Sequence, residues 1–313
     1  MSVPFAFVFP GQGSQSVGML AAWGDHPAVT QTLAEASAAL GEDIGRLIAE
    51  GPKEALELTT NTQPVMLTAA IACYRAWRTE GGDLPAAVAG HSLGEYTALV
   101  AAGSLTLADA LPLVRFRAQA MQQAVPVGAG AMAAILGLDA AVVRQGCADV
   151  MASTGQVVEP ANFNDPQQTV IAGSKAGVDL ACEKLKGMGA RRALLLAVSA
   201  PFHSSLMRPA AEALRERLAT VPFAAPQMPL LNNIDVAVQT APEALREALY
   251  RQAFGPVRWV ELTLALKARG LRHVFECGPG KVLSGLVRRI DGELVTTTVL
   301  DPASLQQARE LLA

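Results

Sequence analysis

Apolar residues along the chain fall into short continuous runs and into helically spaced series, and the two kinds of segment alternate. A short apolar run is typical of a strand buried on both faces, whereas spacing of three and four residues indicates one face of a helix. Strands are predicted over residues 3–9, 86–90, 274–277 and 294–300. Helices are predicted over residues 63–78 and 106–125, and a further helical segment follows Ser92 and ends at Gly103. Strands separated by helices predict a mostly parallel sheet with helices on both faces.

The pattern changes in the middle of the chain, where shorter elements follow one another closely. Strands are predicted over residues 131–136, 157–163, 168–172 and 192–198, and helices over 140–150 and 175–188. The order strand-helix-strand-strand-helix-strand is that of a ferredoxin-like unit. We therefore predict a small subdomain over residues 129–198, inserted into a larger one made of residues 1–128 and 199–313.

Composition and charge narrow the class of protein. Apolar residues make up 51% of the chain and charged residues 17%, a globular balance, and the formal net charge of −3 gives no overall basic field for nucleic acid or anionic lipid. The four cysteines lie far apart without a CxxC pair, which predicts reduced thiols. The apolar start lacks the basic segment of a signal peptide, and no apolar run approaches the roughly 18 residues that span a bilayer. We expect a monomeric cytoplasmic protein with no metal, nucleic-acid or membrane partner.

The strongest chemical signal is the sequence Gly90-His91-Ser92-Leu93-Gly94, between a predicted strand and a predicted helix. In a G-x-S-x-G turn the two glycines leave room for a sharp bend that projects the serine hydroxyl at the edge of the sheet. Amide hydrogens at the start of the following helix can then stabilise a developing oxyanion. A chance match in a glycine-containing turn is the alternative, but the flanking strand and helix favour a serine nucleophile.

A serine hydroxyl needs a base, and the chain has four histidines. His26 lies in an early loop, His273 begins a predicted strand, and the His91 side chain should point away from the neighbouring serine. His203 lies at a strand-to-helix transition, where loop residues meet the edge of a sheet. By elimination, His203 is the best candidate for the base.

A second glycine-containing loop, Pro10-Gly11-Gln12-Gly13, follows the first predicted strand. It lacks the lysine and the serine or threonine of a P-loop and does not complete a dinucleotide-binding fingerprint, so nucleotide binding is not expected. Its backbone could supply a second N–H group to an oxyanion hole, although a plain tight turn explains the same residues.

A set of motifs in a fixed order resembles the malonyl-CoA:acyl carrier protein transacylases of type II fatty acid synthesis. The resemblance covers residues 5 to about 300, nearly the whole chain. The motifs are Phe9-Pro10-Gly11-Gln12-Gly13-Ser14-Gln15, Thr62-Gln63-Pro64, Gly90-His91-Ser92-Leu93-Gly94-Glu95-Tyr96, Arg117 with Met121-Gln122, Pro160-Ala161-Asn162, Phe202-His203-Ser204 and Glu276-Cys277-Gly278-Pro279-Gly280.

The resemblance implies a fold and a catalytic apparatus. The family fold is an α/β-hydrolase-like core with a mostly parallel sheet and an inserted ferredoxin-like subdomain. Ser92 would be the nucleophile and His203 the base, and the backbone amides of Gln12 and Leu93 would form the oxyanion hole. Gln252 matches the glutamine whose main-chain carbonyl orients the histidine in the family, so no triad aspartate is expected.

The resemblance also implies a substrate pocket. Asn162, Met121 and Phe202 would bind the substrate, and Phe202 resembles the residue of malonyl-selective members; Ala200 departs from the valine of several relatives. Arg117 would bind the free carboxylate of malonate, because a planar guanidinium can grip a carboxylate through two parallel hydrogen bonds. The pattern of the helix alone would instead make Arg117 a surface charge.

The resemblance therefore predicts transfer of malonyl from malonyl-CoA to the phosphopantetheine thiol of holo acyl carrier protein, through a serine ester and without a bound cofactor. An esterase or thioesterase would carry the same serine motif. The malonyl transferase subunit of a malonate decarboxylase and a polyketide-pathway acyltransferase are related alternatives. A non-catalytic carrier-docking module is a further alternative, although such a scaffold would need neither Ser92 nor His203.

Overall fold

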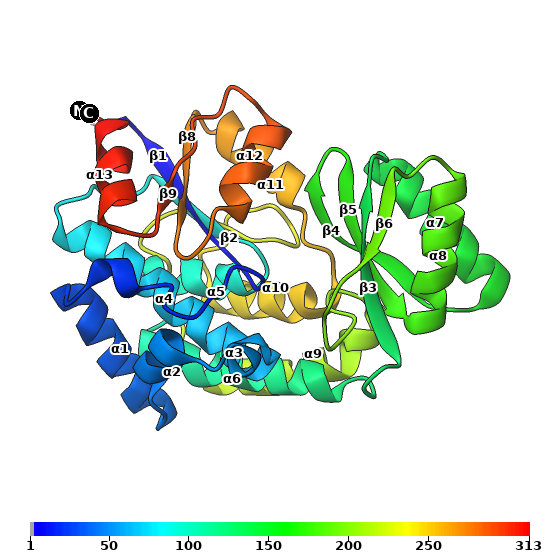
Figure 1. Cartoon of the computed structure of the whole chain (residues 1–313), viewed down its shortest axis with the longest axis horizontal. Coiled ribbons are helices and arrows are strands. Elements are labelled where there is room, and N and C mark those ends of the chain that lie inside the picture. The colour runs from blue at the N-terminus through cyan, green and yellow to red at the C-terminus, as the bar shows by residue number, and fades with distance from the viewer. Residues whose placement is uncertain (1–2) are drawn as a thin grey trace.

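The computed structural model describes residues 3–313, and the strands in this range form two separate sheets (Figure 1). The strands are β1 Phe5–Phe9, β2 Ala87–Gly90, β3 Gly130–Leu136, β4 Val158–Asp165, β5 Gln168–Ser174, β6 Arg192–Leu195, β7 Leu230–Leu231, β8 His273–Cys277 and β9 Thr298–Val299. The α-helices are α1 Pro27–Leu40, α2 Ile44–Glu50, α3 Lys53–Glu57, α4 Thr59–Thr79, α5 Leu93–Ala101, α6 Leu107–Gln123, α7 Ala140–Thr154, α8 Lys175–Gly187, α9 Arg208–Thr220, α10 Pro242–Phe254, α11 Trp259–Ala268, α12 Val282–Ile290 and α13 Pro302–Glu310.

β1 lies at the centre of the larger sheet, whose order is β7-β2-β1-β8-β9 and whose strand pairs are all parallel. Its side chains alternate in direction, as successive residues of a strand do. Phe5, Phe7 and Phe9 enter the core on one face, and Ala6 and Val8 enter the core on the other. All five are at most 1% exposed, so this strand is covered on both faces, as the sequence predicts.

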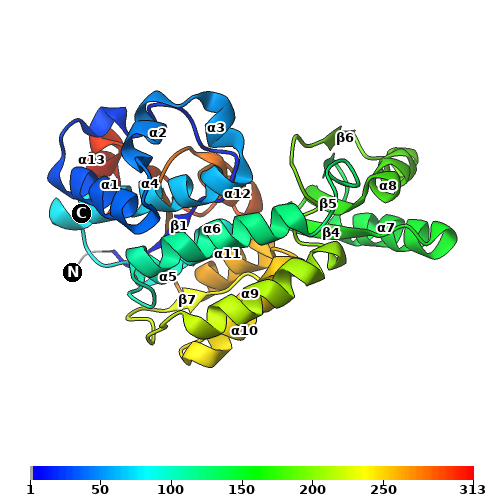
Figure 2. The same cartoon turned by 90° about the horizontal axis from the view of Figure 1, so that it is seen from below.

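Helices provide this cover. Buried side chains of α4, α5, α6 and α10 belong to the core on the phenylalanine face, and those of α11 and α12 belong to the core on the opposite face. The helices α6, α9 and α10 lie side by side (Figure 2). None of the helices between residues 3 and 313 combines the length and the apolarity that crossing a bilayer would require.

The smaller sheet has the order β4-β5-β3-β6, and its pairs are antiparallel. α7 and α8 pack on one face of it, through residues such as Val143, Cys147, Val178 and Leu185 (Figure 1). With a parallel sheet and a separate small antiparallel sheet, the predicted fold class is confirmed. The subdomain boundaries at 128/129 and 198/199 stay a prediction, because sheet membership shows only that residues 130–195 carry the smaller sheet.

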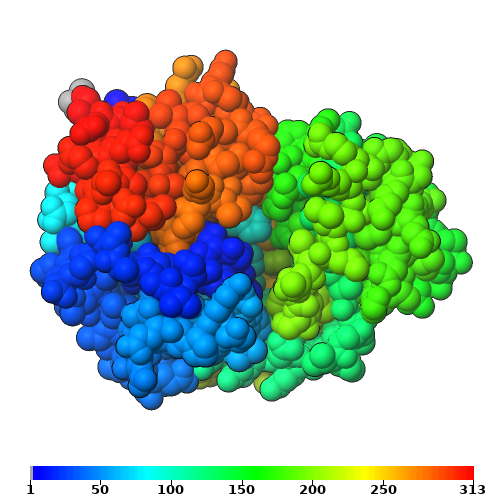
Figure 3. Space-filling view, in the orientation of Figure 1, coloured from blue at the N-terminus to red at the C-terminus, as the bar shows by residue number. Residues whose placement is uncertain are grey.

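The molecule has two parts, the larger sheet with its helices and the smaller sheet with α7 and α8. Hydrogen bonds join them, in addition to the two places where the chain passes from one part to the other. The backbone N–H of Phe163 in β4 donates to the carbonyl of Val257, and the N–H of Val257 donates to the carbonyl of Ala161, both at 2.9 Å. Arg289 Nε in α12 also donates to Asp165 Oδ2 at 2.7 Å. A groove lined by residues of both parts separates them elsewhere (Figure 3). These contacts hold the walls of that groove in place.

Two predicted strands are longer than the structure makes them. Of residues 294–300, only Thr298–Val299 pairs as β9, and Val295 adds a single bridge to His273. The strand predicted over 192–198 ends at Leu195, and the chain beyond it lines the groove. In both places the apolar run extends beyond the paired residues, and Leu196 and Val198 are themselves exposed. The length of an apolar run therefore overestimated the length of the paired strand.

The turn between β2 and α5 leaves no space for a side chain on either of its glycines. A methyl group on Gly94 would lie 2.1 Å from the carbonyl oxygen of Phe9, and one on Gly90 would lie 1.9 Å from the backbone of Gly94. Real Cβ atoms do not approach other heavy atoms so closely. β1 and this turn therefore meet backbone against backbone.

Gly94→Ala should lower the free energy of unfolding by about 1–3 kcal/mol or more, because backbone atoms on both sides of the added methyl would have to move. Gly187→Ala is the matched control, since Gly187 lies in α8 with open space around it, and it should be neutral or stabilising by up to about 1 kcal/mol. Denaturant unfolding of both variants measures the difference. Equal stability of the two would contradict the packing described for the turn.

Candidate active site

Ser92 lies in the sharp turn between β2 and α5, with φ 54° and ψ −108°. A residue other than glycine rarely adopts a positive φ, and such conformations persist where surrounding contacts enforce them. Asn233 makes these contacts: its Oδ1 accepts from the Ser92 N–H at 2.7 Å, and its Nδ2 donates to the Gly90 carbonyl at 2.6 Å. Asn233, which is fully buried, therefore clamps the turn that presents the hydroxyl.

His203 lies against this hydroxyl, with its Nε2 2.7 Å from Ser92 Oγ. The histidine also has a positive φ, 62°, so two of the three such non-glycine residues between positions 3 and 313 form this pair. His203 Nδ1 lies 2.9 Å from the main-chain oxygen of Gln252 and 3.1 Å from that of Gly255. Because both neighbours are acceptors, we place the proton on Nδ1, which leaves Nε2 free to accept the serine proton.

The carbonyls that face His203 are at the C-terminus of α10, where the last residues of a helix carry unsatisfied carbonyls and a partial negative charge. This negative end can stabilise the imidazolium that forms when His203 takes a proton, a task that an aspartate performs in a serine triad. Burial, and next the Arg117 charge, lower the pKa of His203 to about 3. The imidazole is therefore neutral at pH 7, the form in which Nε2 can accept a proton.

Gln12 and Leu93, whose backbone amides are predicted to form the oxyanion hole, both lie near Ser92. Leu93 is the first residue of α5, so its N–H has no acceptor within the helix. Gln12 lies in the loop after β1 and lines the same cavity as Ser92. The loop reaches this position because Gly11 has no side chain; a methyl group there would lie 2.7 Å from the carbonyl oxygen of His91. The roles of Gln12 and Leu93 stay predictions, but both lie at the serine.

Arg117 is only 1% exposed, so the interpretation of this residue as surface charge, taken from the helix pattern, is wrong. Its Nη1 donates to Gln63 Oε1 at 2.8 Å, and its Nη2 donates to Ser92 Oγ and to Gln252 Oε1, both at 3.2 Å. The guanidinium also lies over the Tyr96 ring, 5.4 Å from its centroid. Among the ion pairs within residues 3–313, none involves Arg117. The site thus holds a buried cation whose partners are neutral.

A cavity of about 150 Å³ adjoins Ser92 and His203. Asn162 and Phe202 line it, as predicted, together with Arg117. The wall does not include Met121, which is 1% exposed in the core, and its role in binding stays a prediction. The cavity opens into the groove between the two parts, a space of about 650 Å³ whose lining includes Leu58, Gln122, Leu196 and Phe202.

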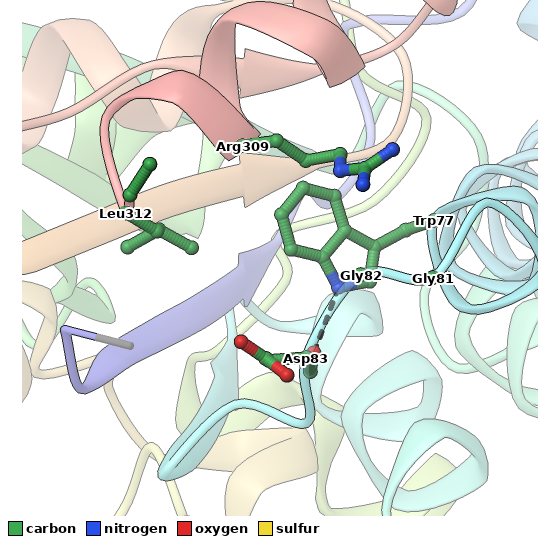
Figure 4. A pocket seen from close by; sticks show the side chains of 7 residues that line it. Trp77, Gly81, Gly82, Asp83, Arg309 and Leu312 are labelled. Carbon is green, nitrogen blue, oxygen red and sulfur yellow. Dashed lines mark hydrogen bonds between the residues drawn. The ribbon is translucent and has the colours of Figure 1, made fainter. Parts of the chain in front are cut away.

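Another cavity, of about 350 Å³, lies near the C-terminus and offers a contrast (Figure 4). Trp77 and Arg309 line it, but the Trp77 indole N–H is already satisfied by the Asp83 carbonyl at 2.8 Å. The lining residues include neither a histidine, a serine nor a buried charge. This cavity therefore offers no group comparable to the Ser92–His203 pair.

The sequence analysis assigned no role to several residues around the Ser92–His203 dyad. Gln63 and Glu95 belong to the motifs quoted above, and both side chains form hydrogen bonds within the site. Gln63 accepts from Arg117, and Glu95 accepts from Gln252 Nε2 at 2.9 Å. Asn233 has no motif around it, so only the folded chain reveals it. His91 is among the residues that line the cavity, while its side chain bonds through Nε2 to Asn164 Oδ1 at 2.9 Å and not to Ser92.

This arrangement supports acyl transfer through a serine ester. A hydroxyl hydrogen-bonded to a neutral imidazole can attack a carbonyl, and amides at a helix start can hold the oxyanion. The buried guanidinium favours an acyl group that carries its own carboxylate. The groove provides an extended approach to the serine for a long substrate.

Known proteins resemble the chain over nearly its full length. The model of the acyl transferase domain family matches residues 6–289. A malonyl CoA-acyl carrier protein transacylase of Escherichia coli K12 is 51% identical over 308 residues, which cover 98% of this chain and 99% of that protein. The corresponding protein of Bacillus subtilis is 45% identical over 308 residues, covering 98% and 96%.

Solved structures agree with this match. The acyl-carrier-protein S-malonyltransferase of Burkholderia pseudomallei superposes with a TM-score of 0.97 at 64% identity, covering 98% of this chain and 100% of that chain. A malonyl-transacylase solved in complex with a type II PKS acyl-carrier protein gives a TM-score of 0.96 at 48% identity, covering 98% and 99%. The chain belongs to the acyl transferase family and, within it, to the malonyl CoA-acyl carrier protein transacylases.

Proposed function

We propose that this protein is a malonyl-CoA:acyl carrier protein transacylase of fatty acid synthesis, working by a ping-pong mechanism through a malonyl ester of Ser92. Kinship over 98% of the chain with transacylases of this name supports the activity. The observation that carries the assignment of malonyl is the buried Arg117, which bonds to Ser92 Oγ and has no carboxylate partner among residues 3–313.

In the first half-reaction, Ser92 Oγ attacks the thioester carbonyl of malonyl-CoA while His203 Nε2 takes the hydroxyl proton. The 2.7 Å contact between these atoms supports direct transfer. The amides of Gln12 and Leu93 hold the oxyanion, and the carbonyls at the end of α10 stabilise the imidazolium. Collapse of the intermediate breaks the carbon–sulfur bond, and the imidazolium returns its proton to the sulfur of CoA.

In the second half-reaction, the phosphopantetheine thiol of acyl carrier protein enters by the same groove. His203 takes the thiol proton, the sulfur attacks the malonyl ester, and the proton returns to Ser92 Oγ as the ester bond breaks. Every proton is carried by the one imidazole and every bond change occurs at the acyl carbon. The proposed reaction therefore needs neither a metal nor a bound cofactor.

Arg117 separates this proposal from an esterase or a thioesterase, which the Ser92–His203 pair would serve equally well. A buried guanidinium leaves a neutral acyl group such as acetyl facing an unpaired charge, which costs several kcal/mol. A malonyl carboxylate supplies the missing partner and accepts two parallel hydrogen bonds. The site is thus built for a substrate that hydrolases of neutral esters do not use.

Acyl carrier proteins are acidic, so we propose that the carrier docks on a local basic surface. Arg191, directly before β6, and Arg289 of α12 line one cavity of about 390 Å³ at the junction of the two parts. Asp165 lines it as well and pairs with Arg289, so the positive charge of this surface comes from Arg191. Leu136, at the far end of β3 from Met132 in the active-site cavity, lines it too. This surface therefore lies a few residues along β3 from the substrate site.

We further propose that the protein acts as a monomer in the cytoplasm. All four cysteines are buried free thiols, which suits a reducing compartment.

Ser92→Ala should abolish the covalent malonyl-enzyme and leave the fold intact, because the half-buried hydroxyl forms the ester and contributes little packing. Intact-protein mass spectrometry after incubation with malonyl-CoA detects the adduct, and thermal unfolding checks the fold. If the alanine variant still took up one malonyl group per chain, Ser92 would not be the nucleophile.

Arg117→Ala should reduce kcat/KM for malonyl-CoA by at least about a hundredfold, since loss of ~3 kcal/mol of pairing corresponds to that factor. The slow use of acetyl-CoA should be unchanged or improved, because the emptied cavity no longer holds an unpaired cation. Arg117→Lys should rescue only partly, since an ammonium group lacks the two-pronged geometry. The measurement is the malonyl-to-acetyl ratio of kcat/KM for each variant. The same ratio in wild type and alanine variant would remove Arg117 from carboxylate binding.

A further inference from the structure

Glu95 is a buried carboxylate that the proposed transfer reaction does not use. It lies on α5, three residues after the nucleophile, and is 2% exposed. A glutamate at this position of a helix commonly reaches back to the amide of the N-cap residue. Here the Ser92 amide is already bonded to Asn233 Oδ1, so the Glu95 side chain is directed elsewhere.

A single oxygen of this carboxylate joins the supports of both catalytic residues. Glu95 Oε2 accepts from Gln252 Nε2 at 2.9 Å and from the backbone N–H of Asn233, also at 2.9 Å. Gln252 presents its main-chain oxygen to His203 and donates from its side chain to the Ser92 carbonyl at 3.0 Å. Asn233 clamps the Ser92 turn, as described above. All three supporting residues are at most 2% exposed.

We propose that Glu95 is a positioning residue that fixes the His203 support and the Ser92 clamp relative to each other, and so keeps Ser92 Oγ and His203 Nε2 at reacting distance. The proposal rests on the function proposed above, whose chemistry needs that distance. Hydrogen bonds to an ionised acceptor are roughly twice as strong as those to a neutral one, so the charge of Glu95 is part of the proposed role.

Protonation of Glu95 gives this role a pH dependence. Burial raises the pKa of Glu95 to about 7, against the opposing effects of Gln252, Asn233 and the Arg117 charge. Asp235 and Tyr96 are the other titratable groups that interact with it. As the pH falls through about 7, Glu95 becomes neutral and its two hydrogen bonds weaken, so the reaction should slow. An inflection from His203 would lie far lower, because its pKa is about 3.

The test follows the rate at which a neutral alkyl fluorophosphonate labels Ser92 between pH 5.5 and 8.5. This probe needs the dyad but not the carboxylate site at Arg117, so it isolates the geometry of the dyad. Wild type should slow on the acid side with an apparent pKa near 7. Glu95→Gln should be about tenfold slower at pH 8, since neutral bonds replace charge-assisted ones, and should lack that inflection. Its KM for malonyl-CoA should stay near wild type.

Glu276→Gln is the matched control. Glu276 is also a fully buried carboxylate on the larger sheet, its Oε2 accepts a backbone N–H, from Ser284 at 2.8 Å, and burial raises its pKa. It does not line the cavity at Ser92. The control should therefore label at the wild-type rate with the wild-type pH profile, whereas a purely structural role for both glutamates would change both proteins alike.

A Glu95→Gln protein that labels as fast as wild type at pH 8, or that keeps the inflection near pH 7, would overturn the proposal. If this variant does not fold, wild type decides: a labelling rate that is constant between pH 6 and 8 overturns the proposal as well. A wild-type protein that reacts with the fluorophosphonate but takes up no malonyl from malonyl-CoA would instead refute the proposed function, and the measurement on Glu95 would remain valid.

Discussion

A guanidinium held in the interior without a carboxylate in bonding distance is the constraint on which the rest of the site depends. Removing an ion from water costs several kcal/mol unless hydrogen bonds and nearby charges compensate. Arg117 receives compensation from neutral oxygens of Gln63 and Gln252, from the Tyr96 ring, and from Glu95 at longer range. Burial lowers its pKa all the same. Without substrate, the positive charge of Arg117 is therefore only partly compensated, and a malonyl carboxylate can complete the compensation.

The same cation shapes the catalytic pair. Its charge is the second cause, after burial, of the low pKa of His203, which keeps the imidazole neutral. Its bond to Ser92 Oγ occupies an acceptor position of the hydroxyl, so the serine hydrogen is directed at His203 Nε2. A carboxylate bound at Arg117 would reduce the repulsion that an imidazolium experiences. Substrate binding and proton transfer are thus coupled by electrostatics, and only an acidic acyl group gains from the coupling.

The sequence predicted the parts of this design that follow from local pattern. Neighbouring residues were enough to predict the alternation in β1, the glycines of the Ser92 turn and the order of elements in the small sheet. They were not enough to predict the burial of Arg117. Whether that face of the helix meets solvent depends on α4, α5 and α10, and the helix pattern alone indicated a surface charge. Asn233 could not be found at all, since it is one of two adjacent asparagines after the two-residue strand β7 and no motif around it marks it out. The hydrogen-bond acceptors of His203 are main-chain oxygens, which no residue type reveals.

The central claim is that Ser92 carries a malonyl group and passes it to a thiol. Incubation with radiolabelled malonyl-CoA, followed by addition of holo acyl carrier protein, tests this most directly if label is counted separately on the protein, on the carrier and as free malonate. The account predicts label on the protein before the carrier is added, its movement to the carrier afterwards, and little free malonate. Release of most of the label as free malonate, with none on the carrier, would contradict the account and identify a hydrolase.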